Sequence, residues 1–211
     1  CASMILAVLV GIPCGILTAL KKDKLADNIL TTSSLVGISI PNFLLGTLLM
    51  YVFSVKLGWL PTGGMTHYFW TATGFKQAIL PAIALSTATI ASFTRIGRSA
   101  MLDVLQSDYI RTAKSKGLKR KTIILGHALR NALIPLVTQF GTSFGGLLGG
   151  AIITEQVFVI NGVGTYLITA INNRNYPVVQ STVLVIATIF ILINLAVDIL
   201  YCVIDPRISY E

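Results

Sequence analysis

Five long segments without a single charged residue constrain the fold of this chain more than any other feature. They lie at residues 1–20, 28–55, 77–94, 131–154 and 175–197. A helix needs roughly 20 largely apolar residues to cross the hydrocarbon core of a bilayer. Because lipid offers no hydrogen-bond partners to an open backbone, each segment is expected to form a helix rather than a strand. The sequence therefore predicts an all-α, polytopic membrane protein with one transmembrane domain over residues 1–211.

The composition and the placement of charge agree with a lipid environment. Charged residues make up 11% of the chain, whereas soluble domains carry about 25%. The formal net charge of +8 raises the alternative of a nucleic-acid-binding protein. However, every basic residue except Lys56, Lys76 and Arg174 falls in segments on one side of the alternating spans, as expected for cytoplasmic loops. We therefore expect an outer N-terminus, a cytoplasmic C-terminus and no nucleic-acid partner.

The first residue and the cysteines carry two smaller expectations. Residue 1 is Cys and no basic flank precedes the first span, so we expect the chain to begin within a longer protein. A signal peptide is the alternative for residues 1–20, but a basic leading region and a cleavage site are lacking. Cys1, Cys14 and Cys202 have no paired spacing, so they are interpreted as packing residues. No metal site and no cofactor are predicted.

Residues inside the spans suggest helix packing or a transport path. Gly141, Gly145 and Gly149 recur every four residues and place small side chains on one helical face, which favours close packing or a helix that lines a moving pathway. Pro41, followed by Asn42, is expected to kink the second span. Intramembrane carboxylates are functional candidates, but Asp198 lies near the cytoplasmic end, which favours an ion pair with a basic loop residue.

The longest cytoplasmic segment, at about residues 99–130, contains a short helix with defined ends. Ser107 is a favourable N-cap residue, and Asp108 complements the positive end of the helix dipole. Lys114 complements the negative end, and Gly117 suits the left-handed position that follows. A second helix is expected after Gly117 and continues into the fourth span. Such a capped helix could lie on lipid or dock to a protein, and its short apolar face favours docking.

This loop resembles the EAA loop of ABC importer permeases, whose Glu-Ala-Ala-x3-Gly motif forms a coupling helix seated on the ATPase subunit. The motif reads Arg111-Thr112-Ala113-x3-Gly117 in this chain, and residues 108–118 and 127–135 are similar to the dipeptide, oligopeptide and nickel permease branch. The resemblance extends over nearly the whole chain, through residues 39–46, 57–61, 155–158, 162–164, 173–177 and 205–208.

The resemblance implies a non-catalytic subunit in the bacterial inner membrane that forms half of a peptide pathway. Its implied partners are a second permease subunit, two ATP-binding subunits and an extracytoplasmic solute-binding protein. Six helices are typical of the family, so five are expected here. Coupling to the ATPase is assigned to Ser107, Asp108, Tyr109, Arg111, Thr112, Ala113, Lys114, Gly117 and Leu118. Pathway lining or helix packing is assigned to Pro41, Asn42, Gly141, Gly145 and Gly149.

Other classes of transporter remain as alternatives. A nickel or metal-chelate importer shares the same branch of the family. An ion-coupled secondary transporter would need ionisable residues at mid-membrane, and Asp198 alone is weak support for one. No Gly-x4-Gly-Lys-Ser/Thr phosphate loop occurs in the chain, so ATP must be handled by another polypeptide.

Overall fold

The structure is a computed structural model that describes the backbone of residues 2–204 and the side chains of residues 2–200. Every regular element in that part of the chain is a helix. In chain order the elements are α1 (Ala2–Leu20), α2 (Leu25–Ser39), α3 (Asn42–Leu49), η1 (Met50–Lys56), α4 (Ala72–Leu105), α5 (Asp108–Ser115), α6 (Arg120–Thr122), η2 (Ile123–Ala128), α7 (Leu129–Val157), α8 (Val163–Asn172) and α9 (Tyr176–Ile204).

Membrane-spanning length is reached by four of these helical segments. They are Ala2–Leu20, Ala72–Leu105, Arg120–Val157 and Tyr176–Leu200. A fifth span is obtained if the bent pair Leu25–Ser39 and Asn42–Lys56 is counted as one. The prediction of an all-α polytopic membrane protein is therefore confirmed.

The prediction of one continuous helix over residues 28–55 was wrong. The chain bends by 102° between α2 and the helix that starts at Asn42. The residue before a proline is driven out of the helical region by the proline ring, and Ile40 has the extended angles φ −87° and ψ 122°. Pro41 then starts the next helix, since its carbonyl accepts the first bond of α3 from the Leu45 amide. The predicted kink is thus a complete break.

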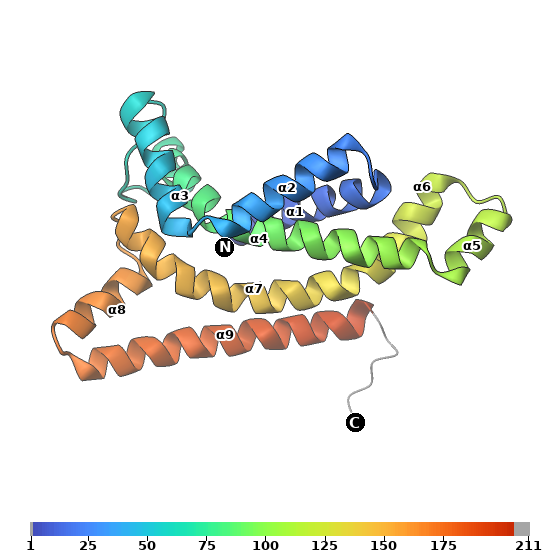
Figure 1. Cartoon of the computed structure of the whole chain (residues 1–211). Coiled ribbons are helices and arrows are strands. Elements are labelled where there is room, and N and C mark those ends of the chain that lie inside the picture. The colour runs from blue at the N-terminus through green and yellow to red at the C-terminus, as the bar shows by residue number, and fades with distance from the viewer. Residues whose placement is uncertain (1, 205–211) are drawn as a thin grey trace.

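Helix α4 lies at the centre of the bundle, where it contacts α1, α2, α3 and α7 (Figure 1). Two glycines allow α1 to approach it closely, because a Cβ at Gly15 would lie 2.8 Å from the Thr94 carbonyl oxygen. The Thr94 hydroxyl also donates to the Gly11 carbonyl at 3.3 Å. Small residues four apart are a common means of close approach between membrane helices.

A buried ion pair joins the start of α2 to α4. Arg98 donates through Nε and Nη2 to the two carboxylate oxygens of Asp27, each at 2.7 Å. Asp27 also accepts bonds from the Asp23 amide and the Thr31 hydroxyl. This bidentate geometry satisfies a carboxylate that is only 3% exposed, and it fixes the distance between the two helices.

The loops gather at two opposite ends of the bundle. Figure 1 shows α5 and α6 at one end and α8 and the end of η1 at the other. Ala19, near the turn that joins α1 to α2, packs in one cluster with Ile110 of α5. The loops predicted to be cytoplasmic therefore share one end of the molecule. Which side of the membrane this end faces stays a prediction.

The end opposite α5 is built around Phe158 and Glu155, which lie in and just after the last turn of α7. Phe158 is 1% exposed, and its carbonyl accepts a bond from the Gly64 amide at 2.7 Å. The Glu155 carboxylate accepts from the Thr165 amide at 2.8 Å, in the first turn of α8. A Cβ at Gly162 or Gly164 would meet this carboxylate. The glycines of the 162–164 motif therefore make room for an acid at a helix N-terminus, where negative charge is stabilised.

Candidate functional site

The helix α5 stands at the end of the bundle between α4 and α6, as the sequence predicts. Ser107 occupies the N-cap position with extended angles, φ −68° and ψ 152°. Its hydroxyl oxygen accepts no capping bond from the helix amides, and the hydroxyl donates to the Val104 carbonyl at 2.6 Å. The expectation that the Ser107 side chain caps α5 was wrong. The hydroxyl ties the turn back to the last turn of α4.

The far end of α5 has the left-handed glycine that the sequence predicts. Gly117 has φ +74°, its amide donates to the Lys114 carbonyl, and the Leu118 amide donates to the Ala113 carbonyl. These two bonds form a Schellman motif, which satisfies the last carbonyls of a helix. Residues other than glycine and asparagine are disfavoured at such an angle. The end of α5 is therefore fixed by its sequence.

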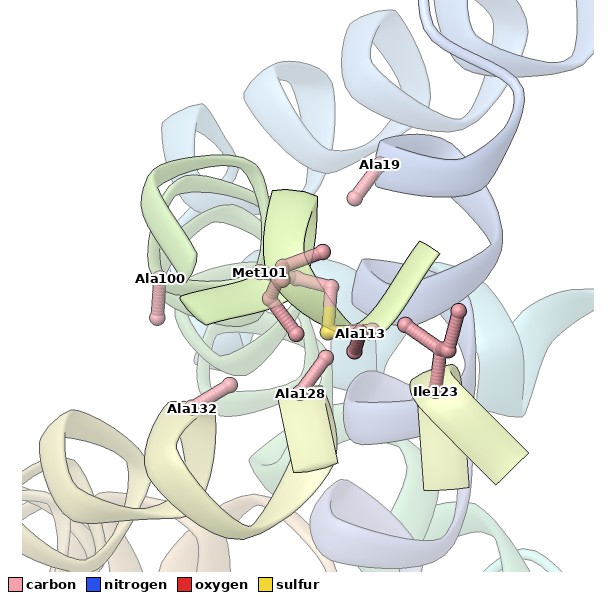
Figure 2. Packing of buried hydrophobic residues seen from close by; sticks show 8 residues of the cluster. Ala19, Ala100, Met101, Ala113, Ile123, Ala128 and Ala132 are labelled. Atoms are coloured by element: carbon pink, nitrogen blue, oxygen red, sulfur yellow. The ribbon is translucent and has the colours of Figure 1, made fainter. Parts of the chain in front are cut away.

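The inner face of α5 is anchored in a hydrophobic cluster formed by this chain itself. Ile110 is fully buried and Ala113 is 9% exposed. They pack with Met101 of α4 and with side chains of α1, η2 and α7, and Figure 2 shows Ala113 beside Met101 and Ala128. Ala113 was assigned to the ATPase contact, but its methyl group faces inward. Its side chain is therefore a packing residue that holds α5 in place, and Ile110 is an anchor that the motif did not reveal.

The outer face of α5 and the turn after it are polar and basic. Its exposed side chains are Asp108, Tyr109, Arg111, Thr112, Lys114, Ser115, Lys116 and Leu118. Arg111 and Asp108 form an exposed ion pair at 3.4 Å, which contributes little to stability. No acidic residue occurs in the sequence between positions 109 and 154. This face is therefore suited to a partner surface that carries negative charge.

A hydrogen bond joins α5 directly to α7. The side-chain amide of Asn131 donates to the Tyr109 hydroxyl oxygen at 2.6 Å. Along the chain the two helices are separated by the turn at Gly117, by α6 and by the π-helical segment η2. Such π-helical segments are rare and often lie at functional sites. The sequence predicted a second helix in this place but gave no sign of its π-helical turn.

The five residues assigned to the pathway or to packing fall in different surroundings. Pro41 and Asn42 lie at the bend, where the Asn42 amide nitrogen is 3.5 Å from the place of a Cβ on Gly150. Gly141 and Gly145 pack against α9, with Asn194 and Val197 near the first and Phe190 near the second. Gly149 has no neighbour within 4 Å of an added Cβ. Two of the three glycines are thus packing residues, and Gly149 faces open space.

Helix α7 presents one exposed face that carries no charge and few large apolar side chains. The α7 stripe, as we name it, consists of Asn131, Pro135, Thr138, Thr142, Gly146, Gly149 and Ile153, all exposed. Steps of three and four residues keep these positions on one side of a helix. By contrast, α9 exposes large apolar residues such as Leu184, Ile191 and Leu195. The α7 stripe is therefore unlike a lipid-facing surface, whereas α9 has the composition of one.

Two further sequence expectations concern ionisable groups. Asp198 is exposed on α9, and it makes no hydrogen bond or ion pair with a residue from 2 to 200. Its suggested partner Arg207 lies outside the described residues. No group of three or more His, Cys, Asp or Glu side chains that could hold a metal ion occurs in the part of the chain that the structure describes.

Comparisons with known proteins agree with the motif in the loop. Residues 11–210 match the family model described as the binding-protein-dependent transport system inner membrane component. The dipeptide transport system permease protein DppB of Alkalihalophilus pseudofirmus is 44% identical, over 99% of this chain and 69% of its own length. The glutathione transport system permease protein GsiC of Salmonella typhimurium is 46% identical, over 99% of this chain and 66% of its own. The chain thus spans about two thirds of these relatives.

Solved structures show the same fold. A chain of the MetNI methionine ABC transporter in an inward-facing conformation superposes with a TM-score of 0.74, covering 96% of this chain and 89% of that one. A second crystal form of that transporter gives the same score. The sequence identity is 18%, so this likeness describes the arrangement of helices.

Proposed function

We propose that this chain, which belongs to the family of inner membrane components of binding-protein-dependent transport systems, forms half of the translocation pathway of an ABC importer for peptides. The family match covers residues 11–210. The two relatives reported above are named for a dipeptide and for glutathione, and glutathione is itself a tripeptide. These names favour a peptide over nickel or a metal chelate as cargo.

In the proposed complex the chain lies in the inner membrane and has three kinds of partner. A second permease completes the pathway, two ATP-binding subunits sit on the cytoplasmic side, and a solute-binding protein delivers cargo from outside. The chain carries no phosphate-binding loop, so ATP hydrolysis belongs to the ATP-binding subunits. The positive-inside rule supports a cytoplasmic position for the end of the bundle that carries α5, because the basic loops gather there.

The observation that carries the proposal is the construction of α5. It is a short helix with a fixed C-terminal cap, a buried inner face and an exposed basic outer face. A helix built in this way can receive force from a protein on its outer face and pass it to the helices beneath. Ile110 and Ala113 contact the ends of α1 and α4 through their common cluster. A movement of the ATP-binding subunits would thus bias the packing of the whole bundle.

The pathway itself is assigned to the α7 stripe and to the bend at Pro41 and Asn42. The stripe offers mainly polar or small groups on an exposed helix face, and the bend offers the half-buried polar side chain of Asn42 beside the exposed Pro41. Neither offers a charged side chain, and this fits a passage that accepts many peptides by size. Selection of the cargo would then belong to the external binding protein. Exchange of that binding protein should change the transported peptide, whereas substitutions in the α7 stripe should change the rate for all peptides together.

The coupling role of α5 can be tested at its cap. Gly117→Val places a β-branched side chain at φ +74°, which costs roughly 1 kcal/mol or more and displaces the end of α5. Gly117→Asn is the matched control, because asparagine tolerates the left-handed region. In vesicles that contain the complete transporter, uptake and ATPase stimulation by the loaded binding protein should be lost with valine and kept with asparagine. Wild-type stimulation in a stably assembled valine variant would refute the role of α5.

A further inference from the structure

The hydrogen bond between Tyr109 and Asn131 is the side-chain bond that joins α5 to another helix within residues 2–200. It is short, at 2.6 Å, and both residues are exposed at the surface of the bundle. Tyr109 keeps 43% of its surface exposed, so its ring is not part of the cluster that anchors α5. The pair therefore links two helices at the surface and is not part of the hydrophobic core.

Besides the hydrophobic cluster that Ile110 and Ala113 share with Ala132, two routes lead from α5 to α7. The route along the chain passes through the left-handed turn at Gly117, the single turn of α6 and the π-helical segment η2. The direct route consists of the bond from Asn131 to Tyr109. A displacement of α5 that travelled along the chain alone would have to cross a change of direction and a change of helix type. The direct bond avoids both.

The position of Asn131 gives this bond its significance. Asn131 is the first residue of the α7 stripe, and Pro135, Thr138 and Thr142 follow on the same side of the helix. The stripe is the face that we assign to the translocation pathway. One end of the hydrogen bond therefore belongs to the helix that faces the ATP-binding subunits, and the other end belongs to the helix that faces the cargo.

We propose that Tyr109 and Asn131 are positioning residues that pass the movement of α5 to α7 and so link ATP hydrolysis to the opening of the pathway. This proposal rests on the proposed function of α5. A neutral hydrogen bond at an exposed site competes with water and contributes modestly to folding. Its loss should therefore leave the subunit folded and assembled while the two helices move less closely together.

The test compares single and double variants in the complete transporter with its ATP-binding subunits, second permease and binding protein in vesicles. Tyr109→Phe removes the hydroxyl and Asn131→Ala removes the amide. We expect each to lower the number of peptides transported per ATP hydrolysed by roughly two- to tenfold, the range of one net hydrogen bond. The number of peptides transported per ATP should fall no further in the double variant than in either single variant, because the two residues act through one bond.

A conservative variant separates the link from a merely structural role. Asn131→Asp replaces the donor by an acceptor, to which the Tyr109 hydroxyl can donate. It should keep coupling when residue 109 is tyrosine and lose it when Tyr109 is replaced by phenylalanine. Tyr51→Phe is the matched control, since Tyr51 lies on η1 and is exposed to a similar degree, at 51%. It should leave the number of peptides per ATP unchanged.

The outcomes distinguish failure of this link from failure of the proposed function. If Gly117→Val uncouples transport while Tyr109→Phe and Asn131→Ala do not, the link is wrong and α5 keeps its role. Additive losses in the double variant would show two independent effects and would also overturn the link. Dissociation of the ATP-binding subunits from Tyr109→Phe would identify a docking residue instead. If neither Gly117→Val nor the link variants change coupling, the proposed function of α5 fails first.

Discussion

Removal of the side chain that anchors α5 gives the most quantitative test of its attachment. Ile110→Ala deletes three carbons from a side chain that is fully buried. At about 0.8 kcal/mol for each buried carbon, the transfer cost is about 2.4 kcal/mol, and the cavity left behind raises the total toward the 2–5 kcal/mol found for such substitutions. Because α5 is a short helix, Asp108–Ser115, the substitution should lower the free energy of local opening of α5 and leave the stability of the spans unchanged.

Hydrogen exchange in the assembled transporter measures that opening directly. A loss of about 2.4 kcal/mol corresponds to exchange about 50-fold faster at the amides of α5, while the amides of α4 should be unaffected. Leu125→Ala is the matched control, because Leu125 lies in the same segment between α4 and α7 but is 53% exposed. Equal exchange rates in the two variants would refute the argument that Ile110 holds α5 against the bundle.

Three further predictions concern orientation and packing. In a background without cysteine, a cysteine at Ser115 should react only with reagents in the cytoplasm and one at Thr62 only from outside; the reverse pattern contradicts the orientation. Gly15→Leu should lower the thermal stability of the purified subunit strongly, since even a Cβ there lies 2.8 Å from the Thr94 carbonyl oxygen, whereas Leu17→Ala, at a site 47% exposed, should change it little. Glu155→Ala should speed hydrogen exchange in the first turn of α8, where the Thr165 amide loses its acceptor. Glu155→Gln should largely preserve the protection of that amide from exchange. Equal protection in the two variants would contradict the capping role of Glu155.

Much of the fold follows from one-dimensional patterns. Charge-free length predicts the spans because the lipid requirement acts on each helix separately. The end of α5 is predictable for the same reason, since Gly117 acts through its own backbone angle. Ser107 shows the limit of such rules, because a favourable residue type at the N-cap position need not accept a bond from the helix amides, and this hydroxyl donates to the Val104 carbonyl.

Partners far apart in the sequence could not be predicted in this way. The Asp27 and Arg98 pair joins residues 71 positions apart, and each looks like an ordinary member of a cytoplasmic charge cluster. In the sequence, Asn131 is likewise no more than the first residue of a predicted span. Only the folded structure shows that it lies beside Tyr109. The inward direction of Ala113 depends on where α1 and α4 end relative to α5. These features depend on how the helices pack against one another. No periodic pattern in a single sequence reveals that packing.

The break between α2 and α3 has a consequence for hydration. A helix end leaves its last carbonyls and the next helix leaves its first amides without partners inside the helix. Hydrocarbon supplies none, and the 102° bend at Pro41 lies within a segment free of charge. The remaining groups therefore need polar partners from neighbouring protein or from water, well inside the apolar part of the chain. Where water supplies them, the tightness of the membrane to protons and ions depends on how the neighbouring helices close over the bend.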